Sequence, residues 1–168
     1  MNSHPGGESH TLHMLELARL SSGRAIDLGA GAGDSLRLMC SAGIEAVGID
    51  LEPRGADVIQ GDMLALPYPD SSFDAAMAQC SFYVSGNVEK ALAESCRILK
   101  SGGRLMLSDV CFCDIEPLIK AAGFEIEQAE DMTAQWREYY FEALWNGTAG
   151  CCQFRGKCRY MLYICRKV

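Results

Sequence analysis

The chain has 168 residues, of which 49% are hydrophobic, and a formal net charge of −7 at pH 7. This length and hydrophobic content fit one compact domain with its own core and leave little room for a second. The net negative charge argues against a nucleic acid partner. No apolar run reaches the roughly 18–20 residues of a membrane span, and the N-terminus lacks the features of a secretion signal, so we expect no membrane contact and a cytoplasmic location.

Hydrophobic periodicity predicts helices and strands in alternation. We expect a flexible tail over residues 1–9 and a single domain over residues 10–168. The first half of that domain is predicted to contain a helix at 11–20, a strand at 24–28, a helix at 34–42, and strands at 44–49, 57–60 and 73–79.

The second half continues the alternation. Asn87 is a predicted helix cap, and Gly102 and Gly103 are expected to end that helix after residue 100. The pattern then predicts a strand at 104–109, a helix at 115–122, an edge strand at 124–129, a helix at 134–144 and a last strand at 158–165. This order predicts an α/β fold, a Rossmann-like, doubly wound and mostly parallel sheet with helices on both faces.

The most informative stretch is AIDLGAGAGDS, residues 25–35, in which an apolar run breaks into alternating glycines. In a doubly wound sheet such a loop lies where ligands bind, at the carboxyl ends of the strands. A dinucleotide fingerprint has glycine at its first, third and sixth positions, but counting from Gly29 the sixth position is Asp34. This spacing favours S-adenosylmethionine over a nicotinamide dinucleotide, and a purely structural turn is the third alternative.

Two aspartates support an adenosine site. Asp50 ends the second predicted strand, where its carboxylate can accept hydrogen bonds from both ribose hydroxyls. Asp62 follows the short third strand, where it can accept a hydrogen bond from an adenine amino group. Either aspartate alone is more typical of a turn, but the two together, at the ends of successive strands, favour a bound adenosine.

Four segments in this order carry a family resemblance: IDLGAGAG, VGID, GDMLALPYPDSSFDAAMA and RILKSGGRLMLSDV. Over about residues 24–110 the chain resembles the class I S-adenosylmethionine-dependent methyltransferases, in the methyltransferase type 11 branch with ubiquinone/menaquinone C-methyltransferases and arsenite methyltransferases. The resemblance implies a seven-stranded sheet with a reversed last strand, and S-adenosylmethionine as cofactor. The cofactor-binding residues that it implies are Asp27, Gly29, Ala30, Gly31, Asp50, Leu51, Gly61, Asp62, Met63 and Gln79.

Within that set, the resemblance assigns each part of the cofactor to different residues. Asp27 and the loop glycines line the methionine end, Asp50 and Leu51 hold the ribose, and Asp62 and Met63 hold the adenine. The expected reaction is an in-line transfer of a methyl group to a small molecule, for which the protein mainly aligns the acceptor with the methyl.

Cys80 is the candidate catalytic residue, because it follows the fourth predicted strand at the rim where the methyl is expected. Arsenite methyltransferases have a similar cysteine there, and a soft thiolate suits an As(III) or thiol acceptor. The alternative is a cysteine buried as a small apolar group. The chain lacks a cysteine before Cys40, unlike the arsenite enzymes, and only CFCD separates the fifth strand from the next helix. A non-catalytic cofactor-binding or metal-binding protein is therefore the alternative function.

Other side chains could contribute to the acceptor region. Nine cysteines without a secretion signal are expected to be thiols, and four of them could meet as a thiolate site for a metal or metalloid, or simply be scattered: Cys111, Cys113, Cys151 and Cys152. His10 or His13 could fold over the acceptor. Trp136, Tyr140 and Leu144 have helical spacing and either cover an aromatic acceptor or pack on the sheet.

Overall fold

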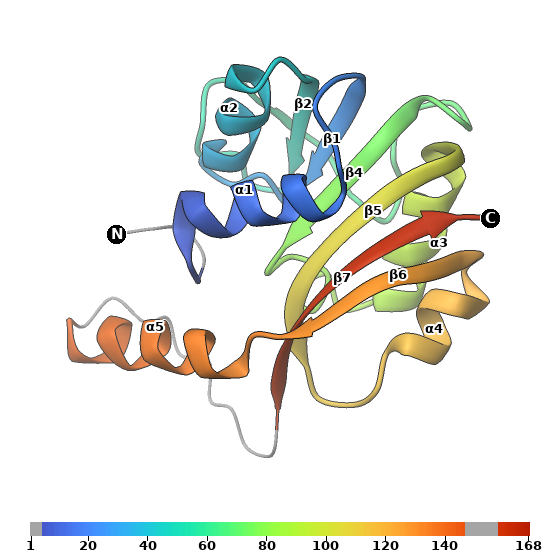
Figure 1. Cartoon of the computed structure of the whole chain (residues 1–168). Coiled ribbons are helices and arrows are strands. Elements are labelled where there is room, and N and C mark those ends of the chain that lie inside the picture. The colour runs from blue at the N-terminus through green and yellow to red at the C-terminus, as the bar shows by residue number, and fades with distance from the viewer. Residues whose placement is uncertain (1–4, 147–157) are drawn as a thin grey trace.

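A computed structural model describes residues 5–146 and 158–168 of the chain. Seven strands form one sheet in the order β3-β2-β1-β4-β5-β7-β6. All pairings are parallel except those of β7, which runs antiparallel to both β5 and β6. The mostly parallel sheet with a reversed last strand is therefore confirmed, and β6 lies at the sheet edge as predicted (Figure 1).

The elements follow the expected order. The strands are β1 (Arg24–Leu28), β2 (Glu45–Asp50), β3 (Val58–Gln60), β4 (Phe73–Gln79), β5 (Leu99–Cys111), β6 (Phe124–Asp131) and β7 (Arg159–Lys167). The helices are α1 (Gly7–Leu17), α2 (Asp34–Ser41), α3 (Val88–Ile98), α4 (Glu116–Ala121) and α5 (Thr133–Trp145). None of the described helices is long and apolar enough to cross a membrane.

The core has two layers, because successive side chains of a buried strand point to opposite faces of the sheet. Along β4, Ala75 and Met77 pack in the cluster that contains residues of α1 and α2. Ala76 and Ala78 pack in the cluster that contains residues of α3 and α4. The expected helices on both faces are thus present, with these two pairs on opposite sides of the sheet (Figure 1).

The N-terminal helix begins earlier than predicted. α1 starts at Gly7, so residues 7–9, which we expected in a flexible tail, are helical. Gly6 precedes the helix in a left-handed conformation, and the Ser9 hydroxyl donates a hydrogen bond to its carbonyl. The polar segment GGESH has no apolar periodicity of its own, and burial of His10 and Thr11 against the rest of the protein holds this turn in place.

The predicted end of α3 is wrong. The helix stops at Ile98, and β5 runs from Leu99 through both glycines instead of starting at residue 104. The register with β4 shifts here, which makes a bulge in the strand pair. A Cβ at position 103 would lie 2.9 Å from the carbonyl oxygen of Lys100 and 3.0 Å from that of Asp74. The glycine pair thus permits a close backbone approach inside a strand.

Candidate cofactor-binding site

A cavity of about 410 Å³ opens at the carboxyl ends of β1, β2 and β4. Its volume lies within the roughly 300–1,000 Å³ of small-molecule sites, and its place is the one where doubly wound sheets bind ligands. All ten residues expected at the cofactor line it, and so does Cys80: Asp27, Gly29, Ala30, Gly31, Asp50, Leu51, Gly61, Asp62, Met63, Gln79 and Cys80.

The glycine loop after β1 contacts the end of β2 and the loop that follows β4. The backbone N–H groups of Gly29 and Ala30 donate to the Ile49 carbonyl at 2.8 and 3.1 Å. Gly29 has a φ of 80°, and a Cβ there would lie 2.4 Å from the Cβ of Ser81. Only glycine fits, because any side chain would clash with the loop that follows β4. The glycine therefore lets two loops approach each other at the cavity wall.

The two aspartates predicted to bind adenosine also stabilise the local backbone. One carboxylate oxygen of Asp50 accepts from the Gly31 N–H at 2.8 Å, and the other accepts from the Glu52 N–H at 2.9 Å. Asp62 accepts from the Leu64 N–H at 2.8 Å. A carboxylate has about four acceptor positions, so these turns leave acceptor capacity on both aspartates. The turn and ligand interpretations of these residues are compatible.

Asp27 is a buried carboxyl at the base of the cavity, with 3% of its surface exposed. Burial, and next the nearby charge of Asp50, raise the pKa of Asp27 to about 7, although a hydrogen bond from the Leu36 backbone opposes the shift. A cation bound in the cavity would stabilise the ionised form. The site therefore contains a carboxyl whose charge near neutral pH is coupled to the charge of its ligand.

The first helix contacts a residue of the cavity wall, a contact that the sequence analysis missed. The Gln79 side-chain oxygen accepts from the hydroxyl of Ser35 at 2.6 Å and from that of Thr11 at 3.2 Å. These bonds connect β4, α2 and α1 beside the cavity, which Ser35 also lines. Arg54 is a second missed lining residue, and its N–H donates to the Gly31 carbonyl at 2.9 Å. Neither contact has a sequence signal, because the partners are far apart in the chain.

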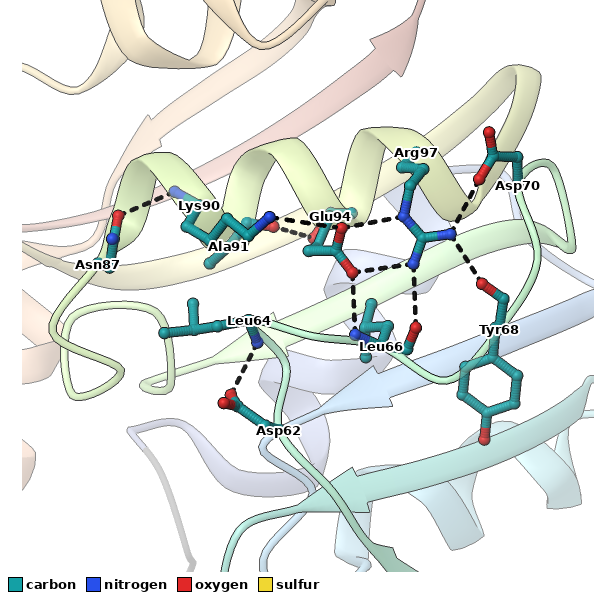
Figure 2. A network of polar contacts seen from close by, with 11 residues as sticks. Asp62, Leu64, Leu66, Tyr68, Asp70, Asn87, Lys90, Ala91, Glu94 and Arg97 are labelled. Carbon is teal, nitrogen blue, oxygen red and sulfur yellow. Dashed lines mark hydrogen bonds and ion pairs between the residues drawn. The ribbon is translucent and has the colours of Figure 1, made fainter.

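An arginine on α3 holds the loop between β3 and β4, which carries Asp62. The Arg97 guanidinium donates to the carbonyls of Leu66 at 3.0 Å and Tyr68 at 2.7 Å (Figure 2). It also pairs with Glu94 at 2.8 Å, while Glu94 accepts from the Leu66 N–H at 2.9 Å. The two side chains thus replace water as partners for a loop that has no regular structure. They position one wall of the cavity without lining it.

Cys80 lies at the rim, as predicted, in a left-handed conformation with a φ of 54° that is uncommon for a residue with a side chain. Its N–H donates to the Ser108 carbonyl at 2.8 Å, and its thiol lies 3.1 Å from the Tyr160 hydroxyl. The side chain is partly exposed and lines the cofactor cavity. Cys80 is therefore a partly exposed residue of the cavity wall and is not fully buried.

The two candidate histidines line a second cavity, of about 210 Å³, beside α1 and the start of α5. His10 is buried and lies 2.7 Å from the Ser108 hydroxyl, whereas His13 pairs with Glu130 at 2.9 Å. Trp136 also lines this cavity, with its ring stacked on Tyr160 at a centroid distance of 6.4 Å. Trp136 therefore both packs on β7 and lines a cavity, while the side chain of Leu144 lies outside the described part of the structure.

The proposed thiol cluster is only partly within the described residues. Cys111 is buried, and burial together with the charge of Asp109 raises the pKa of its thiol to about 12. Cys113 is exposed. A metal ion would have to displace the proton of this thiol to bind Cys111. Cys151 and Cys152 lie outside the described residues, and within residues 5–146 and 158–168 no three histidine, cysteine or acidic side chains are grouped to hold a metal.

This sheet order with a reversed β7, and a glycine loop facing acidic residues at the ends of the next strands, define the class I S-adenosylmethionine-dependent methyltransferase fold. Residues 26–107, about half of the chain, match the model of the family described as methyltransferase domain. The matched region contains the glycine loop, Asp50, Asp62 and Cys80.

Curated relatives include demethylmenaquinone methyltransferases. The protein from Thermus thermophilus is 40% identical over 101 residues, which are 50% of this chain and 46% of the relative. The protein from Deinococcus radiodurans is 36% identical over 100 residues, which are 50% of this chain and 42% of the relative. The chain thus spans about half the length of the curated relatives it matches.

Solved structures resemble this chain over nearly its whole length. Phosphoethanolamine N-methyltransferase 2 of Haemonchus contortus, solved with S-adenosyl-L-methionine, has a TM-score of 0.75 at 17% identity, covering 98% of this chain and 53% of its own. The cyclase SpnF has a TM-score of 0.76 at 24% identity, covering 95% and 80%. At these identities the likeness concerns the fold alone, and this fold hosts more than one type of reaction.

Proposed function

We propose that the chain is an S-adenosylmethionine-dependent methyltransferase that acts on a small molecule. The observation that carries this proposal is the gathering of Asp27, Asp50 and Asp62 around the glycine loop in one cavity. The match of residues 26–107 to the methyltransferase domain family supports this proposal. The cofactor supplies the methyl group as a sulfonium, whose positive charge suits a cavity rich in carboxylates.

The residues present fit this cofactor at both ends. Asp27 and the loop glycines are proposed to face the methionine part, where the ionised Asp27 would balance positive charge. Asp50 has acceptor positions free for ribose hydroxyls, and Leu51 lies beside it in the wall. Asp62 and Met63 are proposed to hold the adenine. The loop after β4 approaches Gly29 closely, which supports a tightly packed cavity wall beside the proposed methionine part.

Calorimetric titration of the purified protein tests this assignment. We expect S-adenosylmethionine and S-adenosylhomocysteine to bind and NAD not to bind, because the glycine spacing does not suit a pyrophosphate. Binding of NAD alone would overturn both the cofactor and the family-based function. Absence of binding by all three compounds would also contradict the proposal.

For the acceptor, we propose a soft nucleophile, a thiol or a metalloid such as arsenite, held at Cys80. The partly exposed thiol at the cavity rim supports this choice. Replacing Cys80 with serine is expected to abolish transfer of a labelled methyl group to arsenite or a small thiol, while affinity for S-adenosylmethionine stays unchanged. The matched control is Cys113→Ser, which changes an exposed cysteine outside the cavity. Full transfer by the Cys80 variant would contradict the assignment.

A non-catalytic binding protein is the second candidate function. Only residues 112–115 separate β5 from α4, so this connection provides little cover for an acceptor. Cofactor binding without methyl transfer to any thiol, metalloid or hydroxyl compound in the screen would favour this alternative.

A further inference from the structure

Four side chains from separate parts of the chain form a continuous line of polar contacts. The Cys80 sulfur lies 3.1 Å from the Tyr160 hydroxyl, which accepts a hydrogen bond from the Ser108 hydroxyl at 2.8 Å. The Ser108 hydroxyl in turn lies 2.7 Å from Nε2 of His10. The members come from the loop after β4, from β7, from β5 and from α1. Each distance is that of a hydrogen bond.

This line connects the two cavities. Cys80 lines the cofactor cavity, whereas His10 and the Tyr160 ring line the second cavity. Ser108 is fully buried, and Tyr160 and His10 are 1% and 5% exposed. A buried line of three hydroxyl or imidazole groups ending at a thiol is well protected from water. Such a line can pass a proton between its ends without diffusion of the carrier.

The hydrogen bonds between these four groups can point in either direction along the line. The thiol, both hydroxyls and the imidazole can each donate or accept a hydrogen bond. Burial, and next the charge of Cys80, raise the pKa of Tyr160 well above its ordinary value. Tyr160 thus keeps its proton and can donate to a thiolate. Reversal of the line moves a proton from one end to the other while both intermediate groups stay neutral.

We propose that Tyr160 and Ser108 form a proton relay through which His10 acts as the base for Cys80 and for the acceptor end of the site. In the structure the Ser108 hydroxyl donates to Tyr160, and the relay requires the reverse direction, in which Tyr160 donates to Ser108. The Cys80 proton then passes to the Tyr160 oxygen, the Tyr160 proton to Ser108, and the Ser108 proton to Nε2 of His10. The products are a thiolate and an imidazolium, so charge and protons balance. Tyr160, Ser108 and His10 are positioning residues in this scheme, since they act through Cys80.

The relay deepens the proposed function and rests on it, because it favours an acceptor that loses a proton. When a thiol or hydroxyl acceptor forms its new bond to the methyl carbon, the bond from that carbon to the cofactor sulfur breaks and its electron pair stays on the sulfur. The proton of the acceptor must then leave, and the thiolate of Cys80 can take it. His10 returns the site to its starting state by releasing its own proton. Among soft acceptors this favours thiols over arsenite.

Other titratable groups surround the relay and affect its pH dependence. From β5, Asp109 is buried, and its charge raises the pKa of Tyr160. From α5, Tyr139 faces Cys80, and burial, and next the charge of Cys80, raise the pKa of that tyrosine. From α1, His13 is paired with Glu130 and lines the same cavity as His10. A test must therefore separate His10 from these neighbours.

Peptide-resolved alkylation by iodoacetamide between pH 6 and pH 9 tests the relay on the full chain without cofactor. We expect the Cys80 rate to rise at a lower pH than that of Cys113, an exposed thiol in the same sample. Tyr160→Phe keeps the aromatic ring but breaks the line, and His10→Gln removes the base. Each variant is expected to slow Cys80 alkylation at pH 7 about tenfold, because the thiolate fraction falls.

The sign of the effect separates a relay from a packing role. Loss of packing at Tyr160 or His10 would expose Cys80 and speed its alkylation, whereas loss of the relay slows it. If Tyr160→Phe does not fold, His10→Gln and Ser108→Ala provide the same measurement. Equal titration of Cys80 and Cys113, or an unchanged Cys80 profile in the folded variants, would overturn the relay. Calorimetry with S-adenosylmethionine separately reports any failure of the proposed function.

Discussion

Replacing Asp27 with asparagine is expected to stabilise the ligand-free protein and to weaken its binding of S-adenosylmethionine. The pKa of this buried carboxyl is raised to about 7, so ionising it costs free energy that a neutral amide avoids. At pH 8 we expect a gain of about 2–4 kcal/mol in the free energy of unfolding. This corresponds to a rise of about 4–16 °C in Tm. Cofactor affinity should fall by about 10 to 100-fold, because a charged partner is lost.

The pH dependence of this result follows from the sign of the shift. Below about pH 4 the Asp27 carboxyl is protonated in both the folded and the unfolded protein, so the variant gains little. As the pH rises from about 4 to 7, the unfolded chain loses this proton first, and the wild type loses stability relative to the variant. Binding of S-adenosylmethionine by the wild type should strengthen as the pH rises through 7, and the variant should lack this dependence.

The matched control for Asp27 is Asp34→Asn. Asp34 lines the same cavity, but it is exposed and pairs with Arg37 at the surface. We expect its Tm to change little, because exposed ion pairs contribute little to stability. Thermal unfolding and calorimetry at pH 6 and pH 8 provide both readouts. A lower Tm for Asp27→Asn at pH 8, or cofactor affinity equal to that of the wild type, would contradict the role assigned to this carboxyl.

Replacing Arg97 with methionine is expected to destabilise the protein by about 2–3 kcal/mol and to weaken cofactor binding several-fold. The change leaves the carbonyls of Leu66 and Tyr68 without their donor and leaves the largely buried Glu94 without its charged partner. Methionine retains much of the apolar stem, so packing is largely preserved. The cofactor effect is indirect: the loosened loop carries Asp62 (Figure 2).

Arg104→Met is the matched control for Arg97. The Arg104 side chain is 33% exposed, against 31% for Arg97, and from β5 it pairs with Glu127 on β6, across the intervening strand β7. Its hydrogen bonds go to that carboxylate and not to a loop carbonyl. We expect this variant to lose at most about 1 kcal/mol and no cofactor affinity. Urea unfolding measures the loss of stability, and calorimetry measures the loss of cofactor affinity. Equal losses of both quantities in the two variants would contradict a specific role of Arg97 in the loop.

Much of this protein is determined by local sequence. The bounds of β1 and β4 agree with their predictions, because each is a short apolar run between polar turns. The residues predicted to bind the cofactor line one cavity because a glycine loop and two aspartates follow successive parallel strands. The carboxyl ends of such strands meet at one edge of the sheet, so local patterns and a topology rule are sufficient to place Asp27, Asp50 and Asp62 in one cavity.

Contacts between distant residues were decided only by the tertiary structure. His10 and Ser108 are separated by 98 positions, and Cys80 and Tyr160 by 80, so no local pattern predicts their line of contacts. The raised pKa of Asp27 likewise depends on burial by several elements. Residues 100–103 continue a strand because close backbone packing overrides the tendency of glycine to end a helix. Local patterns thus determined the fold class and cofactor cavity, while packing decided which side chains meet at the acceptor end.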